Sequence, residues 1–252
     1  MTPAPAPAIA QRPTALILAL ALIVPLLAYC VLYLEEPRIR QEAMHNLAAI
    51  GLLKAEQIEH WLIERRGDAE VLLASEGFSD DAQRWFSQGD VAAKARIARR
   101  EAALKDSYAY QAVELVDARA PLDNLPPGRR ALLVAAYASG QVQTGDFYLD
   151  ATGAASLDIV APLIRQAPAV KQPIAAVVFT IRASTYLFPL IQIWPTASPS
   201  AETLLVRRDG EEVLFLNELR HRRGMSLNYR LPLNAPSLPA AIAVRDKRVQ
   251  TL

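Results

Sequence analysis

The sequence predicts an α+β protein in which a transmembrane helix and a long amphipathic stalk helix precede one antiparallel sheet with short flanking helices. Three observations predict it. Residues 15–34 are uncharged and almost wholly apolar. Residues 42–75 repeat apolar side chains at steps of three and four, as one face of a helix requires. From about residue 108 onward, short apolar runs alternate with turn residues, as in strands.

Residues 15–34 are the candidate membrane span. A helix rises about 1.5 Å per residue, so these twenty residues cover the roughly 30 Å hydrocarbon core of a bilayer. Pro25 is tolerated better in a membrane helix than in a soluble one. A cleaved signal peptide has a shorter apolar core, and a lipoprotein signal needs a small residue where Tyr29 precedes Cys30. The charged flank 35–38 argues against a buried soluble helix, so an anchor is favoured.

The ends of this span leave its orientation open. Arg12 lies on one side of it, and Arg38 and Arg40 lie on the other, so the excess of cytoplasmic positive charge does not decide between the two directions. Residues 1–14 are rich in Ala and Pro and poor in bulky apolar side chains, which predicts a disordered tail.

Composition excludes several classes of protein. With 27 basic and 26 acidic residues the net charge is +1, and we expect no nucleic-acid partner. The single cysteine, Cys30, excludes a disulfide framework and a cysteine-rich metal site. Residues 35–252 suit one large domain or one and a half small ones.

The stalk helix is predicted over residues 35–75. Its apolar stripe consists of Ala43, Leu47, Ile50, Ile58, Trp61, Leu62, Ala69 and Leu72. A polar face is expected from Glu56, Glu59, Glu64, Arg65 and Arg66. Residues 80–104 then predict one or two further amphipathic helices around Trp85 and Phe86.

The predicted sheet follows. Strands are expected at 108–117, at 142–150 and 155–163 as a hairpin around Gly153, and at 174–183, whose continuous apolar run predicts a central strand. A short helix over 129–139 should end at Gly140, the residue type preferred after a helix C-terminus.

The last third of the chain contains further turn signals. Ser184 is expected to cap a short helix that ends at 191. Asp209-Gly210 predicts a hairpin between strands 203–208 and 211–217. The segment 231–252 contains three prolines and one possible short strand at 240–244.

Catalytic patterns are absent from the sequence. His45, His60 and His221 have no metal-ligand spacing, and neither a phosphate-binding glycine loop nor a serine nucleophile motif occurs. We therefore expect no enzymatic activity in this chain, no cofactor and no metal site.

Polar and aromatic residues on adjoining predicted strands form the candidate ligand site. An arginine and carboxylates beside aromatic rings suit a small charged ligand, and the candidates are Tyr137, Asp146, Tyr148, Asp158 and Arg182. The alternative is that these side chains point to solvent or pair with one another structurally, because strand residues alternate between faces.

Two stretches resemble a known family. LAAIGLLKAEQIEHWLIERRGDAEVL (47–72) and LFPLIQIWPTASPSAETLLVRRDGEEVLFLNELRHR (187–222) are similar to the extracytoplasmic Cache-type sensor region of bacterial transmembrane receptors. YASGQVQTGDFYLD and SLDIVAPL fit its middle strands, so the resemblance covers about residues 15–235. The family's amino-acid signature of paired tyrosines, an arginine and a distal aspartate is not evident.

The resemblance implies a division of the chain. It comprises a cytoplasmic tail (1–14), a single membrane span (15–34), a stalk helix (35–75), a PAS-like sensor domain on the periplasmic side of the bacterial inner membrane (76–230), and the start of a membrane-proximal module or linker (231–252). A small-molecule ligand, the lipid bilayer and a homodimer through the stalk helix are the expected partners.

Receptors of this type continue into an output domain, usually a histidine kinase, a diguanylate cyclase or a cyclic-di-GMP phosphodiesterase. We expect such an output domain beyond residue 252, or else a partner protein through which the chain acts. The competing hypothesis is a membrane-tethered structural or interaction protein without a small-molecule site.

Overall fold

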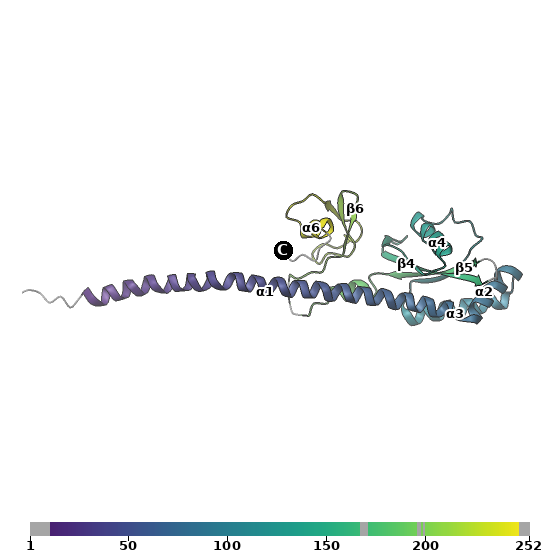
Figure 1. The fold of residues 1–252 in the computed structure, drawn as a ribbon, viewed down its shortest axis with the longest axis horizontal. Helices are drawn as coiled ribbons and strands as arrows, with labels where there is room; N and C mark the ends of the chain where they lie inside the picture. The colour runs from purple at the N-terminus through teal and green to yellow at the C-terminus, as the bar shows by residue number, and fades with distance from the viewer. Residues whose placement is uncertain (1–10, 167–170, 196–197, 199, 247–252) are drawn as a thin grey trace, which may run out of the picture. The chain divides into compact units, whose positions relative to one another are not determined.

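A computed structural model describes residues 11–166, 171–195, 198 and 200–246, and it confirms the α+β class (Figure 1). The chain divides into two compact units, one up to Ile50 and one from Gly51 onward. The second unit contains every strand and all helices but the first part of α1 among the described residues.

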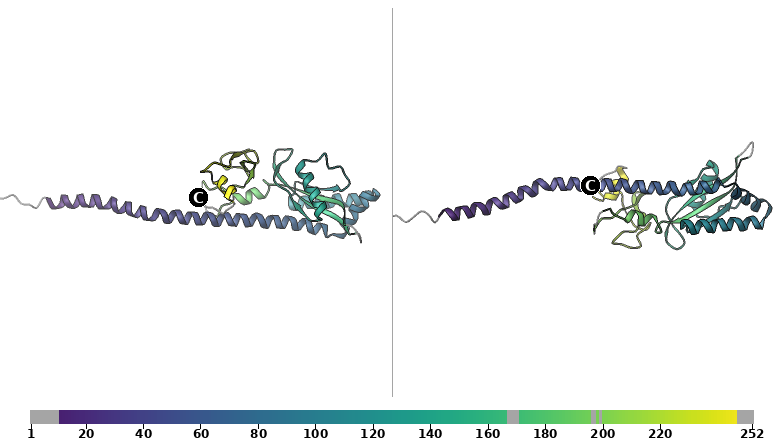
Figure 2. Two further views of the ribbon diagram at one scale, coloured as in Figure 1. Left: turned by 45° about the horizontal axis from the view of Figure 1, so that its top comes forward. Right: turned by 90° about the horizontal axis from the view of Figure 1, so that it is seen from below.

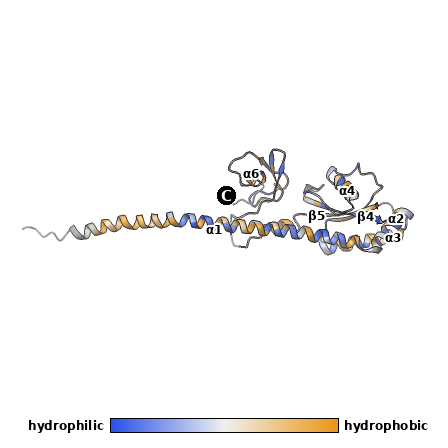
Figure 3. Ribbon diagram, viewed as in Figure 1, coloured by the Kyte–Doolittle hydropathy of each residue, from blue (hydrophilic) through white to orange (hydrophobic). Residues whose placement is uncertain are grey.

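Helix α1 runs from Gln11 to Leu73 and contains Pro25 and Pro37. It begins four residues before the predicted span, and residues 1–10 of the predicted tail lie outside the described residues. The first part of α1 is apolar, as Figure 3 shows in orange, and its side chains from Leu16 to Leu34 are exposed. Within the described residues, α1 is the one helix long and apolar enough to cross a membrane.

From Gly51 onward, α1 packs on the larger sheet through the predicted stripe. Trp61, Ala69 and Leu72 are buried in the main core, with Ile58 and Leu62 packed against it. The prediction that Arg65 lies on the polar face is wrong, because its side chain is only 18% exposed. Arg65 lies four residues from both Trp61 and Ala69, and helical periodicity therefore places it on the packed face.

Helices α2 (Glu76–Gln88) and α3 (Val91–Tyr108) form the predicted amphipathic region. Gly89, with φ +71°, ends α2, and the Asp90 carboxylate accepts hydrogen bonds from the backbone of Ala92 and Ala93 at 2.9 and 3.1 Å. This is the usual N-terminal cap of a helix. Since α3 continues to Tyr108, the strand predicted from residue 108 begins later than expected.

The larger sheet has five antiparallel strands: β1 (Ala112–Asp117), β2 (Gln143–Thr144), β3 (Tyr148–Leu149), β4 (Ala155–Gln166) and β5 (Lys171–Arg182). The order is β1-β5-β4-β2, with β3 also paired to β4, so the predicted central position of β5 is confirmed. The strand expected over 142–150 is divided into β2 and β3. Between them, the Gly145 amide donates to the Asp158 carbonyl at 2.8 Å, and the next two residues leave the ladder.

The two faces of this sheet have separate cores. Helix α4 (Pro127–Ser139) covers one face, where Leu133 and Ala136 pack on Val160, Ala176 and Val178. The packed part of α1 lies on the other face, and the three views in Figures 1 and 2 agree on this arrangement. Gly140, with φ +67°, ends α4 as predicted.

A second sheet contradicts the expectation of a single one. Strands β6 (Val206–Asp209), β7 (Glu212–Phe215) and β8 (Arg230–Pro232) form it, with a core of their own made with helix α6 (Pro239–Asp246). The predicted hairpin at Asp209-Gly210 is confirmed, with Gly210 at φ +62°. A loop after helix α5 (Leu187–Gln192) separates β6 from the strands of the first sheet.

Two local predictions in this region are wrong. The residue at the N-terminus of α5 is Tyr186 instead of Ser184, and no side chain caps the helix. Residues 240–244 form part of α6 instead of a strand, since alanine has the highest helix propensity and proline suits a first turn.

Candidate functional site

The sheet face under α4 changes from apolar to polar along its strands. Side chains two residues apart share a face, so Asp158 shares one with Val160, and Thr180 with Val178. Val160 and Val178 pack under α4. Asp158 and Thr180 instead line a cleft of about 760 Å³ beside the N-terminus of α4, with Glu114 of β1 on the same face.

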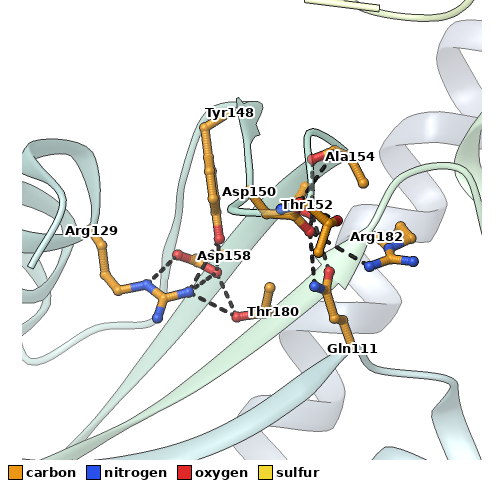
Figure 4. A network of polar contacts seen from close by, with 10 residues as sticks. Gln111, Arg129, Tyr148, Asp150, Thr152, Ala154, Asp158, Thr180 and Arg182 are labelled. Atoms are coloured by element: carbon orange, nitrogen blue, oxygen red, sulfur yellow. Dashed lines mark hydrogen bonds and ion pairs between the residues drawn. The ribbon is translucent and has the colours of Figure 1, made fainter. Parts of the chain in front are cut away.

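Arg129, in the first turn of α4, binds Asp158 through the Nε–Nη2 edge of its guanidinium group. Arg129 Nε and Nη2 donate to Asp158 Oδ2 and Oδ1 at 2.8 and 3.0 Å (Figure 4). The same Nη2 donates to the Tyr148 and Thr180 hydroxyls at 3.1 and 3.0 Å. Burial opposes the charge of Arg129, but the hydrogen bonds and charge of Asp158 outweigh it and raise the pKa of the guanidinium further.

Asp158 is saturated by these partners. Its side chain is 3% exposed, and in addition to the bonds from Arg129 it accepts hydrogen bonds from the hydroxyls of Tyr148 and Thr180 at 3.0 and 2.8 Å. A bidentate charged pair with two further hydrogen bonds is rigid and fully satisfied. A ligand that used Asp158 or the paired edge of Arg129 would have to break this cluster. The remaining Nη1 of Arg129 lies 3.4 Å from Glu114 Oε2.

Asp150 holds the end of the same cleft together. One carboxylate oxygen accepts hydrogen bonds from the Thr152 hydroxyl and from the backbone amides of Thr152 and Ala154, at 2.6, 2.8 and 2.9 Å. These bonds close the turn between β3 and β4. The other accepts Gln111 Nε2 at 2.9 Å (Figure 4). Burial raises the pKa of Asp150, but the hydrogen bonds from Thr152, Gln111 and Ala154 prevail and hold it well below its ordinary value.

The open side of the cleft is lined by acidic groups. The side chains of Glu114 and Asp146 are 54% and 67% exposed, and Arg207 forms an ion pair with Asp146. Four carboxylates line the cleft, at Glu114, Asp146, Asp150 and Asp158, against two guanidinium groups, at Arg129 and Arg207. Each of these two arginines is already paired with an acid. The cleft therefore has an excess of negative charge.

The structure brings three of the five candidate residues together. Asp146, Tyr148 and Asp158 line this cleft. Tyr137 lies elsewhere: it packs in the core under α4, its hydroxyl lies 3.4 Å from the Val116 carbonyl, and burial raises its pKa to about 12. Arg182 pairs with Asp150 at 3.6 Å but lines a different cleft.

Sequence reasoning missed Arg129, Glu114 and Thr180. The sequence contains a signal for this cluster, because the polar residues Asp158 and Thr180 interrupt apolar runs that form buried strands. A carboxylate in such a run needs a basic partner, because an unpaired buried charge is costly. The identity of that basic partner depends on where α4 crosses the sheet, and no local sequence pattern predicts this crossing point.

Within the described ranges, no group of three or more His, Cys, Asp or Glu residues is arranged to hold a metal ion. Neither a family model nor a curated protein matches the sequence. Matches among solved structures include two of low identity. One is the ligand-binding domain of the Pseudomonas aeruginosa PAO1 amino acid chemoreceptor PctC in complex with GABA, at 22% identity and a TM-score of 0.47, over 72% of this chain and 79% of that one.

The other is the extracellular domain of vpHK1S-Z8, a protein assigned to the histidine kinases, at 13% identity and a TM-score of 0.44, over 77% of this chain and 92% of that one. Both are distant matches with TM-scores below 0.5.

Proposed function

We propose that this chain is the signal-sensing region of a bacterial transmembrane receptor, and that the cleft beside the N-terminus of α4 binds a small molecule through a positively charged group. The volume of the cleft, about 760 Å³, is in the range of small-molecule sites. Converging polar groups above a rigid, satisfied cluster suit recognition of a small polar ligand.

The charge of the lining supports the choice of ligand. Of the four carboxylates in the cleft lining, Glu114 and Asp146 have the most exposed side chains. The edge of Arg129 that would hold a ligand carboxylate is occupied by Asp158. An anionic ligand would displace Asp158 from Arg129 and leave it buried without a charged partner. An ammonium or guanidinium group would instead meet acids that remain accessible to solvent. Primary amines and amino acids carry such a group.

The remaining parts of the proposal concern the receptor. The apolar part of α1 would anchor the chain in the inner membrane, with the sheet on the periplasmic side. Occupancy of the cleft would bias one conformation of the stalk, because a ligand shifts an equilibrium by binding one state better than another. A homodimer through the stalk, and an output domain such as a histidine kinase or a diguanylate cyclase, would carry the signal further.

A thermal-shift screen of the full chain in detergent micelles tests the proposal. The library pairs each primary amine or amino acid with an uncharged analogue and with a carboxylate lacking the amine. We expect at least one amine to raise the melting temperature, and its uncharged analogue and amine-free carboxylate to have little effect. Glu114→Gln should reduce the shift, whereas Asp123→Asn, an exposed acid outside the cleft lining, should leave it unchanged.

The screen also separates this proposal from a membrane-tethered structural or interaction protein. Such a protein has no small-molecule site, so no compound would stabilise it selectively. Stabilisation by an amine-free carboxylate that is lost in Arg207→Gln, in the lining of this cleft, would contradict the assigned ligand charge but not the presence of a site.

A further inference from the structure

A second cleft, of about 380 Å³, lies on the opposite side of the larger sheet from α4. Its walls come from the packed part of α1, from the end of α3 and from the end of β5. Two arginines and four aromatic residues line it: Trp61, Arg65, Tyr108, Tyr110, Arg182 and Tyr186. It shares no lining residue with the cleft beside α4.

Arg65 projects into this region with one donor unused. Its Nη1 lies 3.2 Å from Asp68 Oδ2, and its Nη2 lies 3.9 Å from Glu64, whose side chain is 67% exposed. Its Nε atom is buried and has no hydrogen-bond partner among the described residues. The guanidinium carbon lies over the rings of Tyr108 and Tyr110, 5.5 and 6.0 Å from their centroids.

Arg182, at the end of β5, also lines this cleft and also has an unused donor. Its one ion pair within the described residues joins Nη2 to Asp150 at 3.6 Å, which is longer than a good hydrogen bond. Its Nε atom is also buried without a partner in the described part of the chain. Figure 4 shows its guanidinium group beside Asp150 and apart from the Arg129–Asp158 pair. Four buried side-chain atoms in the described ranges lack a partner, and two of them belong to these arginines.

Unsatisfied buried N–H groups are rare, and a guanidinium group presents Nε and one Nη along an edge that matches the two oxygens of a carboxylate. Both arginines have such an edge incompletely used. The aromatic walls suit a planar apolar body: Trp61 and Tyr186 lie nearly parallel, with centroids 6.4 Å apart and an angle of 15° between their planes. Among the described residues, Glu64 is the one carboxylate in the cleft lining, while Asp68 and Asp150 lie outside the lining and each contact one Nη of an arginine.

We infer that this cleft is a second ligand site, specific for a small aromatic carboxylate whose anionic group is held by Arg65 and Arg182. Its charge preference is opposite to that proposed for the first cleft. The inference does not depend on the first proposal, because the two sites share no lining residue and take ligands of opposite charge.

Equilibrium dialysis of the full chain in lipid nanodiscs against radiolabelled benzoate tests this inference, with empty nanodiscs as the blank. We expect saturable binding of about one benzoate per chain. Unlabelled benzoate should displace the label. Benzamide, which has the same shape without the charge, should not displace it at equal concentration.

Variants assign the site. Arg182→Gln and Arg65→Gln should each weaken benzoate binding about tenfold or more, as expected for the loss of a charge-assisted pair. Arg182→Lys should also weaken it, because lysine lacks the planar edge. Arg207→Gln in the other cleft is the matched control and should leave the affinity unchanged.

Folding of each variant is checked by circular dichroism and melting temperature. Tyr186→Ala keeps both arginines and removes an aromatic wall that is largely exposed, so it should weaken binding even if Arg65→Gln fails to fold. Absence of saturable binding, equal competition by benzamide, or binding that survives both arginine substitutions would each overturn the inference. In those cases internal water would satisfy the two Nε atoms.

Discussion

Arg129 and Asp158 form a two-point ion pair on the face of the larger sheet, with Nε–Oδ2 and Nη2–Oδ1 distances of 2.8 and 3.0 Å. The pair joins the first turn of α4 to the middle of the sheet. Because Asp158 is almost fully buried, the position of α4 and the shape of the cleft both depend on this contact.

Replacement of Arg129 by methionine should destabilise the fold strongly. It leaves the Asp158 carboxylate buried with only two hydroxyl partners, and loss of one member of a buried ion pair typically costs about 3–5 kcal/mol. The free energy of unfolding of the full chain, from urea denaturation in micelles, measures this. Arg130→Met is the control, since that arginine lies 3.7 Å from a highly exposed Asp123, and the change should be within about 0.5 kcal/mol. Equal effects of the two substitutions would contradict a special role for Arg129.

Because of Lys54, the free energy of unfolding should increase as the pH rises in the alkaline range. Its ammonium group is buried on α1 and donates to the Leu190 carbonyl at 2.8 Å and to Gln57 Oε1 at 3.2 Å, and burial lowers its pKa. Between the lowered folded pKa and the unfolded value of about 10.4, the unfolded chain binds more protons, so stability rises with pH.

The comparison of wild type with Lys54→Met isolates this effect. The difference in unfolding free energy should shift in favour of the wild type as pH rises from about 8 toward about 10.4. Urea denaturation at several pH values in this window measures it. Parallel curves for the two proteins would show that Lys54 titrates alike in the folded and unfolded states.

Gly145 is predicted to tolerate no side chain. A Cβ atom there would lie 3.1 Å from both the Asp158 carbonyl oxygen and Leu132 Cδ2, although the backbone has no unusual φ. Gly145→Ala should therefore destabilise the protein by about 1–3 kcal/mol through overpacking. Gly67→Ala, at an open position inside α1, should be neutral or stabilise by up to about 1 kcal/mol. The melting temperature should fall in Gly145→Ala and stay the same or rise in Gly67→Ala. A neutral Gly145→Ala would show that the wall of the cleft can move to accept the methyl group.

Features with strong local signals were predictable. The apolar run of α1, the central strand β5, Gly140 at the end of α4 and the Asp209-Gly210 hairpin all follow from period, turn residues and capping. The split into two sheets was not predictable, because strand patterns specify which side chains share a face but not which strands pair. Residues 240–244 are short and apolar, and such a run fits a helix as well as a strand.

The candidate site was predictable only in part. Tyr148 and Asp158 were identified because their side chains suit ligand binding, and the fold brings them together. Arg182 has the right chemistry, but it lies at the end of β5 and lines the other cleft. Arg65 was assigned to the polar face because of its charge, while its spacing from Trp61 and Ala69 favoured the packed face. Spacing was the better guide there.

Isothermal titration of the full chain with the amine that stabilises it most is the most direct test of the ligand site. The account predicts one binding site per chain, a clear loss of affinity in Glu114→Gln and Asp146→Asn, and an unchanged affinity in Asp123→Asn, an exposed acid outside the lining of this cleft. Binding that is lost in Asp123→Asn but retained in both cleft variants would contradict it.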